Sequence, residues 1–430
     1  MLGKAEAIAS ATGEIMRDIG IGRRRLLQGA ATGIVATATR RARAATPVQL
    51  ISHRYPALEF WAAKMKTAVP GVEVNTQLVP FDKALELSTI ALSSKSDTLD
   101  IVYASESTFA SFAKNGWIRP LDDLWAKYKE EFKLGDHADS VIKAFTYKGH
   151  IYVIPADINV MLFFYRGDLL KQAGKQPPQT IAEYQALAKS MNSPMRAGTI
   201  DCLKPVDATL NEAHWYMNTI GGGWFDEAFK PIFNNERGVQ AITALKETSG
   251  YAQRGFASAA NDECSIALQQ DAAAMGLQWA TRAGSMDDPK QSRVVGKIDW
   301  AAPPQGHGRF SADGYTISAF SKQDPDTLFR IVATATGDAN MREASALTVP
   351  TRKSILNDPA LQKKNRFYPA ASAALETALP FPQIPEFYAV GEFIARRVVQ
   401  AVTGEMPVKP ALDAAAMETE NFLTGRGYYK

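Results

Sequence analysis

Short apolar runs alternate with segments of helical periodicity along the chain beyond residue 45. Short apolar runs bounded by Pro, Gly or polar residues are typical of strands, and apolar positions spaced three and four apart are typical of helices. On these rules we predict strands at Val48–Ser52, Val72–Val79 and Leu99–Ala104, and helices at Ala57–Ala68, Phe81–Leu92 and Ser107–Asn115. Strands that alternate with helices in units of about 30 residues indicate an α/β layer with a parallel sheet.

The apolar pattern continues in the second half of the chain. We predict further strands at His150–Pro155, Val160–Tyr165, Gly276–Trp279 and Gly314–Phe320. The first two of these flank a polar segment, Asp157-Ile158-Asn159, which we expect to form a turn. The third ends on an aromatic residue, and the fourth follows a loop rich in Pro and Gly.

Polar and bulky side chains follow two of the predicted strands. His53, Arg54 and Tyr55 come directly after the first strand, and Glu106 follows the third. In α/β sheets of this kind, ligands bind outside the carboxyl ends of the strands. We therefore expect these four residues at a ligand site, with plain surface exposure as the alternative.

The first 44 residues differ in charge from the rest of the chain. They carry eight of the 48 Lys and Arg residues and three of the 45 Asp and Glu residues, so the remainder has 40 basic and 42 acidic groups. The run Arg23-Arg24-Arg25-Leu26-Leu27-Gln28 precedes the mildly apolar Ala30–Thr39 and the triplet Ala42-Arg43-Ala44. This order is typical of a signal peptide and resembles the twin-arginine export motif. We expect residues 1–44 to engage the export machinery and direct the protein to the periplasm; the alternative is a basic N-terminal tail.

Several kinds of chemistry have no signal in the sequence. The nearly balanced charge after residue 44 argues against a nucleic-acid partner, which requires a basic face. The five histidines are scattered without the spacing of metal ligands. A P-loop, a dinucleotide-binding glycine motif, an HExxH pair and a GxSxG elbow are all missing. We expect no cofactor and no metal site.

A series of segments, each weak alone, occurs in an informative order. The series is PGVEV, LDIVYA, GWIRPLDDL, YKGHIYVIPADINVMLFFYRGDLL, PPQTIAEYQALAKSM, GGGWFDE, AAAMGLQW, ADGYTISAFSK, VPTRKS and TGEMPVKPALDAAA. In this order the chain resembles the extracellular solute-binding proteins of ABC importers, in the branch that includes maltose-binding protein. The resemblance covers essentially the whole chain after the leader.

This resemblance implies an α/β fold of two lobes, the periplasmic-binding-protein fold, with the solute held between them. Each lobe is expected to be a mainly parallel sheet flanked by helices. Three hinge crossings are expected near Asp157–Val160, Phe310–Tyr315 and Thr348–Lys353. Residues 45–158 and 311–349 then form an N-terminal lobe, and residues 159–310 and 350–430 form a C-terminal lobe.

The resemblance also implies ligand contacts. Trp279 ends a strand where the family often stacks an aromatic ring on a sugar, and Asp157 matches a frequent hydroxyl-binding carboxylate. Trp215 stands near the GGG turn, where it belongs either to the cleft or to the core. For Trp279 the alternative is core packing, and for Asp157 it is the capping of a turn.

Two of the expected crossings carry further candidates. Asp313 lies at the second crossing beside Tyr315, where the family commonly has two glycines, so Asp313 makes either a ligand contact or a hinge hydrogen bond. Arg352 lies at the third crossing, where it either clamps a ligand group or pairs with a carboxylate across the hinge.

Flat aromatic rings and planar polar groups suit the C–H faces and hydroxyls of sugars. We therefore expect a monomeric, non-enzymatic receptor that captures a sugar or sugar alcohol by hinge closure and delivers it to ABC transporter permease subunits. Two alternatives stay open: a binder of a charged solute such as a polyamine or phosphate ester, and an exported carbohydrate-active enzyme that uses Glu106, Asp157 and Asp313. The positions of Phe387 and Tyr388 depart from the maltose-binding pattern and disfavour a long maltodextrin.

Cys202 and Cys264 are the only two cysteines. Export to an oxidising compartment favours the pairing of an even number of cysteines. We predict a disulfide between them, with two small buried thiols as the alternative.

Overall fold

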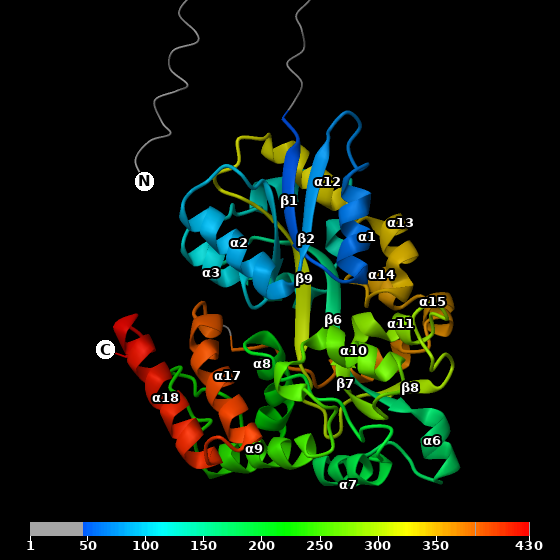
Figure 1. Ribbon diagram of the computed structural model, residues 1–430. Coiled ribbons are helices and arrows are strands. Elements are labelled where there is room, and N and C mark those ends of the chain that lie inside the picture. Colours follow the sequence, from blue (N-terminus) through cyan, green and yellow to red (C-terminus); the bar gives the residue numbers. More distant parts are fainter. Residues whose placement is uncertain (1–45, 383, 430) are drawn as a thin grey trace, which may run out of the picture. The chain divides into compact units, whose positions relative to one another are not determined.

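The computed structural model describes residues 46–382 and 384–429 (Figure 1), so the predicted signal peptide lies outside the described residues. Its strands are β1 (Val48–His53), β2 (Val74–Val79), β3 (Ile101–Ser105), β4 (Thr146–Tyr147), β5 (His150–Ile151), β6 (Ile154–Arg166), β7 (Met275–Trp279), β8 (Ile298–Ala301) and β9 (Phe310–Ile317). Among the described helices, none combines the length and apolarity needed to cross a membrane.

The helices of the first half of the chain are α1 (Pro56–Met65), α2 (Phe81–Ser93), α3 (Phe109–Lys114), α4 (Asp122–Tyr128), α5 (Asp139–Ala144), α6 (Gly167–Gln172), α7 (Ile181–Met191) and α8 (Asp207–Tyr216). Those of the second half are α9 (Glu236–Ser249), α10 (Asn261–Gln269), α11 (Ala283–Met286), α12 (Pro325–Ala335), α13 (Asp338–Glu343), α14 (Lys353–Leu356), α15 (Pro359–Lys364), α16 (Tyr368–Leu375), α17 (Phe387–Thr403) and α18 (Val408–Gly425).

The main sheet is mixed, and its strands follow the order β2-β1-β3-β9-β6-β7, with β8 also paired to β6. The pairs β1–β2 and β1–β3 are parallel, whereas β9 pairs antiparallel with both β3 and β6. Strands β7 and β8 also run antiparallel to β6. The prediction of mainly parallel sheets is therefore correct only for β1, β2 and β3. Strand β9 comes from far along the chain and separates β3 from β6.

Strand β6 differs from the prediction of two strands joined by a polar turn. It runs unbroken from Ile154 to Arg166, with a register shift between Pro155 and Asp157. Its first half pairs with β9, and its second half pairs with β7 and β8. The buried side chain of Asp157 accepts a hydrogen bond from Tyr55, and Asn159 accepts one from Thr281, so the polar residues stay within the strand.

The three segments expected as hinge crossings lie side by side. In the β6–β9 pair, Asp157 stands opposite Asp313 and Ile158 opposite Ala312. The backbone N–H of Ile158 also donates to the carbonyl of Val349 at 3.0 Å. A Cβ atom at Gly314 would lie 2.4 Å from the carbonyl oxygen of Ile154, so only glycine allows this close approach of the two strands.

Apolar side chains form separate clusters around this sheet. One cluster joins β1 and β3 to α1 and α12, and includes the buried residues Leu50, Trp61, Ile101 and Phe329. Another joins the second half of β6 and β7 to α7, α8, α9, α17 and α18. Figure 1 shows β6 and β9 running between these two regions. The ends of β1, β3 and β7 meet the starts of α2, α8 and α17 around the cavity described below.

Candidate ligand-binding site

A narrow cavity of about 40 Å³ lies where elements from distant parts of the sequence meet. Four of the residues expected from the sequence line it: His53 at the end of β1, Tyr55 just after it, Trp279 at the end of β7, and Asp313 in β9. Arg54, between the first two, is exposed. Burial and the neighbouring arginines Arg282 and Arg54 lower the pKa of His53 to about 3, so its imidazole is neutral at physiological pH.

Aromatic rings form one wall of the cavity. The ring centroid of Phe81, at the start of α2, lies 5.6 Å from that of His53 and 5.6 Å from that of Tyr388. Tyr103, in the middle of β3, packs edge-on against the same histidine at 5.8 Å. Trp279 keeps 7% of its surface exposed at the cavity. These rings offer apolar faces to a ligand that carries C–H groups.

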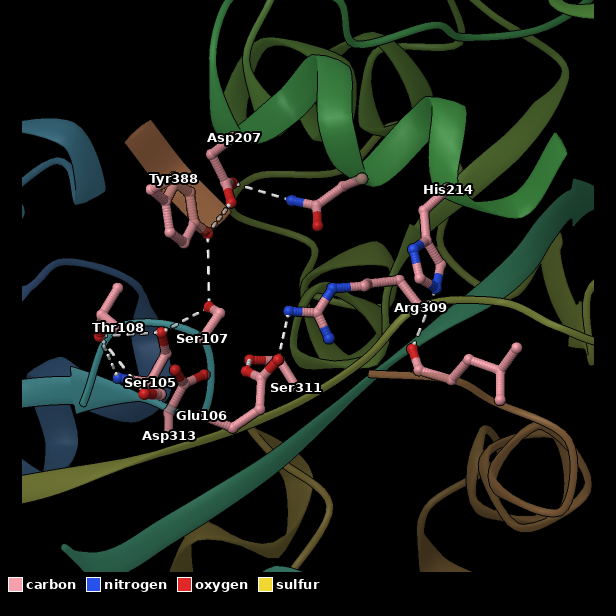
Figure 2. A network of polar contacts seen from close by, with 12 residues as sticks. Ser105, Glu106, Ser107, Thr108, Asp207, His214, Arg309, Ser311, Asp313 and Tyr388 are labelled. Atoms are coloured by element: carbon pink, nitrogen blue, oxygen red, sulfur yellow. Dashed lines mark hydrogen bonds and ion pairs between the residues drawn. The ribbon is translucent and has the colours of Figure 1, made fainter. Parts of the chain in front are cut away.

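Arg309, directly before β9, and Ser311 and Asp313 within it are spaced two apart and all line the cavity. Arg309 Nη2 donates to Glu106 Oε1 at 2.6 Å, and Ser311 Oγ donates to Glu106 Oε2 at 2.8 Å (Figure 2). The Arg309 guanidinium also lies 3.8 Å from the ring centroid of Phe381. Glu106 is thus held behind the cavity lining, where it neutralises and orients the arginine.

Arg282, just beyond β7, supplies a second guanidinium group to the cavity. Its Nη2 donates to Asp262 Oδ1 at 2.9 Å, and its guanidinium lies 5.1 Å from the ring centroid of Tyr55. Among the described residues, Nε and Nη1 of Arg282 and of Arg309 are buried without a hydrogen-bond partner. Buried donors of this kind are costly unless another group accepts from them. Both arginines therefore present N–H groups that fit the oxygen atoms of a ligand.

Acceptors come from the start of α8. Asp207 accepts from Tyr388 Oη at 2.8 Å and from Asn211 Nδ2 at 2.9 Å, and Tyr388 lies next to Ser107 (Figure 2). Burial raises the pKa of Asp207 to about 6. Asn211 Oδ1 is buried without a partner among the described residues. The cavity thus places hydrogen-bond acceptors opposite the arginine donors.

A carboxyl pair lies at the floor of the cavity. Tyr55 Oη donates toward Asp157 Oδ2 at 2.9 Å and toward Asp313 Oδ2 at 2.9 Å. Tyr103 Oη donates to Asp313 Oδ1 at 2.5 Å. Asp157 itself is fully buried and does not line the cavity, so its predicted ligand contact is replaced by a contact with the hydroxyl of Tyr55.

Three further residues expected at the ligand lie in the interior and outside the cavity lining. Trp215 is enclosed by the core around α8, where its indole N–H donates to the carbonyl of Pro304. Tyr315 makes a hydrogen bond with Ser52 at 3.2 Å. Arg352 donates to the carbonyls of Lys133 and Phe132. The Trp215 indole N–H, the Tyr315 hydroxyl and both terminal nitrogens of Arg352 bind protein groups, and none of the three residues lines the cavity, so we do not retain them as ligand contacts.

Several residues that line the cavity were not expected from the sequence, although the spacing of some of them could have indicated them. Arg309 and Ser311 precede Asp313 at intervals of two, which is the spacing of residues on one face of a strand. Asp207 and Asn211 are four apart, the spacing of one helix face. Phe81 begins a helix after a predicted strand. Tyr388 and Arg282 reach the cavity only through the tertiary arrangement.

A family model described as bacterial extracellular solute-binding protein matches residues 52–342, more than half of the chain. The chain belongs to this family. Members of this family are solute-binding receptors, so the alternative of an exported carbohydrate-active enzyme is not retained. The family's description also places it outside the cytoplasm.

Individual proteins of known ligand resemble this solute-binding protein in sequence or in fold. It is 24% identical over 379 residues to the mannitol-binding protein of Pseudomonas aeruginosa, covering 80% of this chain and 84% of the relative. A solute-binding protein of Agrobacterium radiobacter K84 in complex with ribitol superposes with a TM-score of 0.81 at 24% identity, covering 88% and 99% of the two chains. One of Agrobacterium vitis S4 with bound D-mannitol gives 0.80 at 21% identity, covering 89% and 100%.

Proposed function

We propose that this receptor captures one small neutral polyhydroxylated solute, a sugar or a sugar alcohol, and delivers it to ABC transporter permease subunits. The observation that carries the proposal is the pair of buried arginines, Arg282 and Arg309, whose charges are already balanced while their N–H groups remain free. Such groups suit neutral hydroxyl oxygens, which accept from arginine and donate to carboxylates.

The balance of charge favours a neutral solute over the charged alternatives. Arg309 is paired with Glu106, and Arg282 with Asp262. No positive charge is left over for a phosphate ester or another anion. A polyamine would need to lie beside both guanidinium groups, and like charges at short distance repel.

The size of the cavity favours a small solute. Its volume of about 40 Å³ is far below the range for small-molecule sites, so a solute enters only where the lining side chains move apart. The Tyr388 ring, packed beside Phe81, narrows the cavity and is bonded to Asp207. A linear polyol or a single sugar unit fits this space better than a long oligosaccharide does. The mannitol-binding relative and the neighbours holding ribitol and mannitol support the same class.

We infer a capture step in which two lobes close around the solute. The cavity draws residues from both lobes expected from the sequence, such as His53 and Tyr103 on one side and Asp207 and Trp279 on the other. A ligand drives closure only when it gains contacts with both sides in the closed state. Export through a twin-arginine signal in residues 1–44 belongs to the same proposal.

Thermal unfolding of the mature chain with a panel of solutes tests this function. D-mannitol, ribitol, D-tagatose and maltose represent neutral candidates, while spermidine and glycerol 3-phosphate represent charged ones. At 100 times the dissociation constant, a bound solute stabilises the protein by about 2.7 kcal/mol, which shifts the unfolding midpoint by a few degrees. We expect at least one small neutral polyol or sugar to produce this shift and calorimetric binding. Stabilisation by charged solutes alone would overturn the proposal.

A further inference from the structure

The carboxyl groups of Asp157 and Asp313 have more contacts at hydrogen-bond distance than the neighbouring tyrosine hydroxyls have hydrogens to donate. Asp157 and Asp313 stand opposite each other on β6 and β9, and the single hydroxyl of Tyr55 lies 2.9 Å from an oxygen of each. The hydroxyl of Tyr103 is already directed at the other oxygen of Asp313. The two carboxyl groups therefore compete for one hydrogen of Tyr55.

One added proton on the carboxyl pair satisfies both contacts of Tyr55. A phenol hydroxyl has one hydrogen to donate, and an ionised carboxylate has none. If Tyr55 donates to one carboxylate, its contact with the other brings two acceptor oxygens to hydrogen-bond distance. A proton on one carboxyl turns that contact into a second hydrogen bond, with the acid donating to the tyrosine oxygen. Both contacts of Tyr55 are therefore hydrogen bonds when Asp157 and Asp313 carry one proton in total.

The surroundings supply little charge to hold both groups ionised. Asp157 and Asp313 are 0% and 3% exposed. Burial and their mutual repulsion raise the pKa of Asp157, and burial raises the pKa of Asp313 to about 7. The cations that act on the pair are Arg282 from beyond β7 and Arg309 from directly before β9.

The other titratable groups near Asp157 and Asp313 add no positive charge that could keep both carboxyl groups ionised. Glu106, from the turn after β3, adds negative charge near Asp313, and it is the ion-pair partner of Arg309. Arg282 is paired with Asp262. Tyr55 and Tyr103 stay protonated because burial raises the pKa of each phenol, and Tyr315 adds a third neutral phenol.

We propose that Asp157 and Asp313 share one bound proton, and that the receptor takes up this proton when it closes on its solute. The second half of this proposal rests on the proposed function. In an open receptor water reaches the pair through the cavity side, where Asp313 is part of the lining. Closure removes that water, and loss of hydration favours the neutral form of a carboxyl group. Solute and proton then bind together.

The direction of the pH effect follows from this uptake. Linkage requires the affinity for the solute to fall as pH rises between the pKa of the pair in the open receptor and its higher value in the closed one. The slope approaches about tenfold per pH unit where one full proton is taken up. Below this interval the pair is protonated in both forms, and affinity is constant.

Calorimetric titration of the mature chain with D-mannitol measures the proton directly. Titrations at pH 6 and 7 in phosphate and in imidazole, which differ in protonation enthalpy, give the number of protons taken up for each solute bound. We expect uptake of a sizeable fraction of a proton and weaker binding at higher pH. Asp313→Asn and Asp157→Asn should each abolish most of the uptake. An uptake of zero in the wild type, with affinity constant from pH 5 to 8, would overturn the proposal.

Two variants separate this pair from other groups. Asp207→Asn removes the other cavity carboxyl with a raised pKa; we expect it to weaken solute binding and to leave the number of protons taken up for each solute bound unchanged. Asp123→Asn is a matched charge change at an exposed position outside the cavity and should behave as the wild type. Uptake that disappears with Asp207→Asn and persists with Asp313→Asn would assign the proton elsewhere and overturn the proposal.

If D-mannitol does not bind, the titrations are repeated with the neutral solute that stabilises the protein, and a measurement without solute tests the shared proton independently of the proposed function. A carboxyl pKa raised by folding makes the free energy of unfolding decrease as pH rises through the folded value. Urea unfolding from pH 5 to 9 should therefore show a steeper loss of stability in the wild type than in Asp313→Asn. Parallel profiles for the two proteins would overturn the shared proton.

Discussion

Arg309 performs two tasks with one guanidinium group. One nitrogen neutralises the fully buried Glu106, and the other two are buried without a protein partner among the described residues, in a side chain that lines the cavity. Sequence reasoning placed Glu106 at the site but missed the arginine, because the two residues are about 200 positions apart and nothing local connects them. The pair therefore belongs both to the stability of the fold and to the recognition of the solute.

This double role predicts that stability and binding can be separated. Arg309→Met leaves Glu106 buried and unpaired, which should lower the free energy of unfolding by about 3–5 kcal/mol. Adding Glu106→Gln removes the orphaned charge and should restore much of that stability. Binding of the solute, measured by calorimetry, should stay weak in the double variant. A double variant that regains full affinity would show that Arg309 acts only through the fold.

Trp279 is the second residue whose role can be tested alone. It lines the cavity while most of its ring packs in the core. We expect Trp279→Phe to keep the fold and to weaken solute binding at least several-fold, because a smaller ring loses stacking area. Calorimetry and the urea midpoint measure the two effects separately. Loss of stability with unchanged affinity would assign Trp279 to the core.

At the scale of elements, the sequence identified most strands near the site but not their partners. A buried strand is a continuous apolar run whichever direction its neighbours run, so the pattern could not show that β9 inserts antiparallel between β3 and β6. The polar residues in the middle of β6 suggested a turn, and the tertiary partners that satisfy Asp157 and Asn159 lie far away in sequence. The strand-end rule pointed to His53–Tyr55 beside β1 and to Glu106 after β3, whereas Trp279 at the end of β7 was proposed from the family resemblance.

Two elements beside the cavity are joined by Cys202 and Cys264, which form a disulfide in the structure. It links the segment before α8 to α10, and the cysteines are 62 positions apart. On the chain-entropy model a loop of this length stabilises the folded protein by about 4 kcal/mol. We predict that exported protein takes up no alkylating label under denaturing, non-reducing conditions and two labels after reduction. Reduced protein should have a correspondingly lower free energy of unfolding; two labels before reduction would refute the pairing.

At the scale of the whole molecule, contacts across the cavity join the two lobes expected from the sequence. Lys114 of α3 pairs with Glu386, just before α17, and the ring of Phe81 in α2 packs on Tyr388. The ammonium group of Lys204 also lies 3.6 Å from Asp82. These charged contacts are largely exposed and individually weak. The solute, by contrast, can reach buried donors and acceptors on both sides.

This difference predicts that the solute controls the distance between the lobes. Spin labels at Ile90→Cys on α2 and Met195→Cys beyond α7 occupy well-exposed positions, 57% and 93% accessible, in the two expected lobes. A saturating neutral polyol that binds should shorten and narrow the distance distribution measured by pulsed electron resonance, because it adds contacts to both lobes only when they close. The same labels on a chain carrying Trp279→Ala provide a control with weakened binding, in which the change should require more solute. A solute that binds tightly and leaves the distribution unchanged would show that capture proceeds without closure.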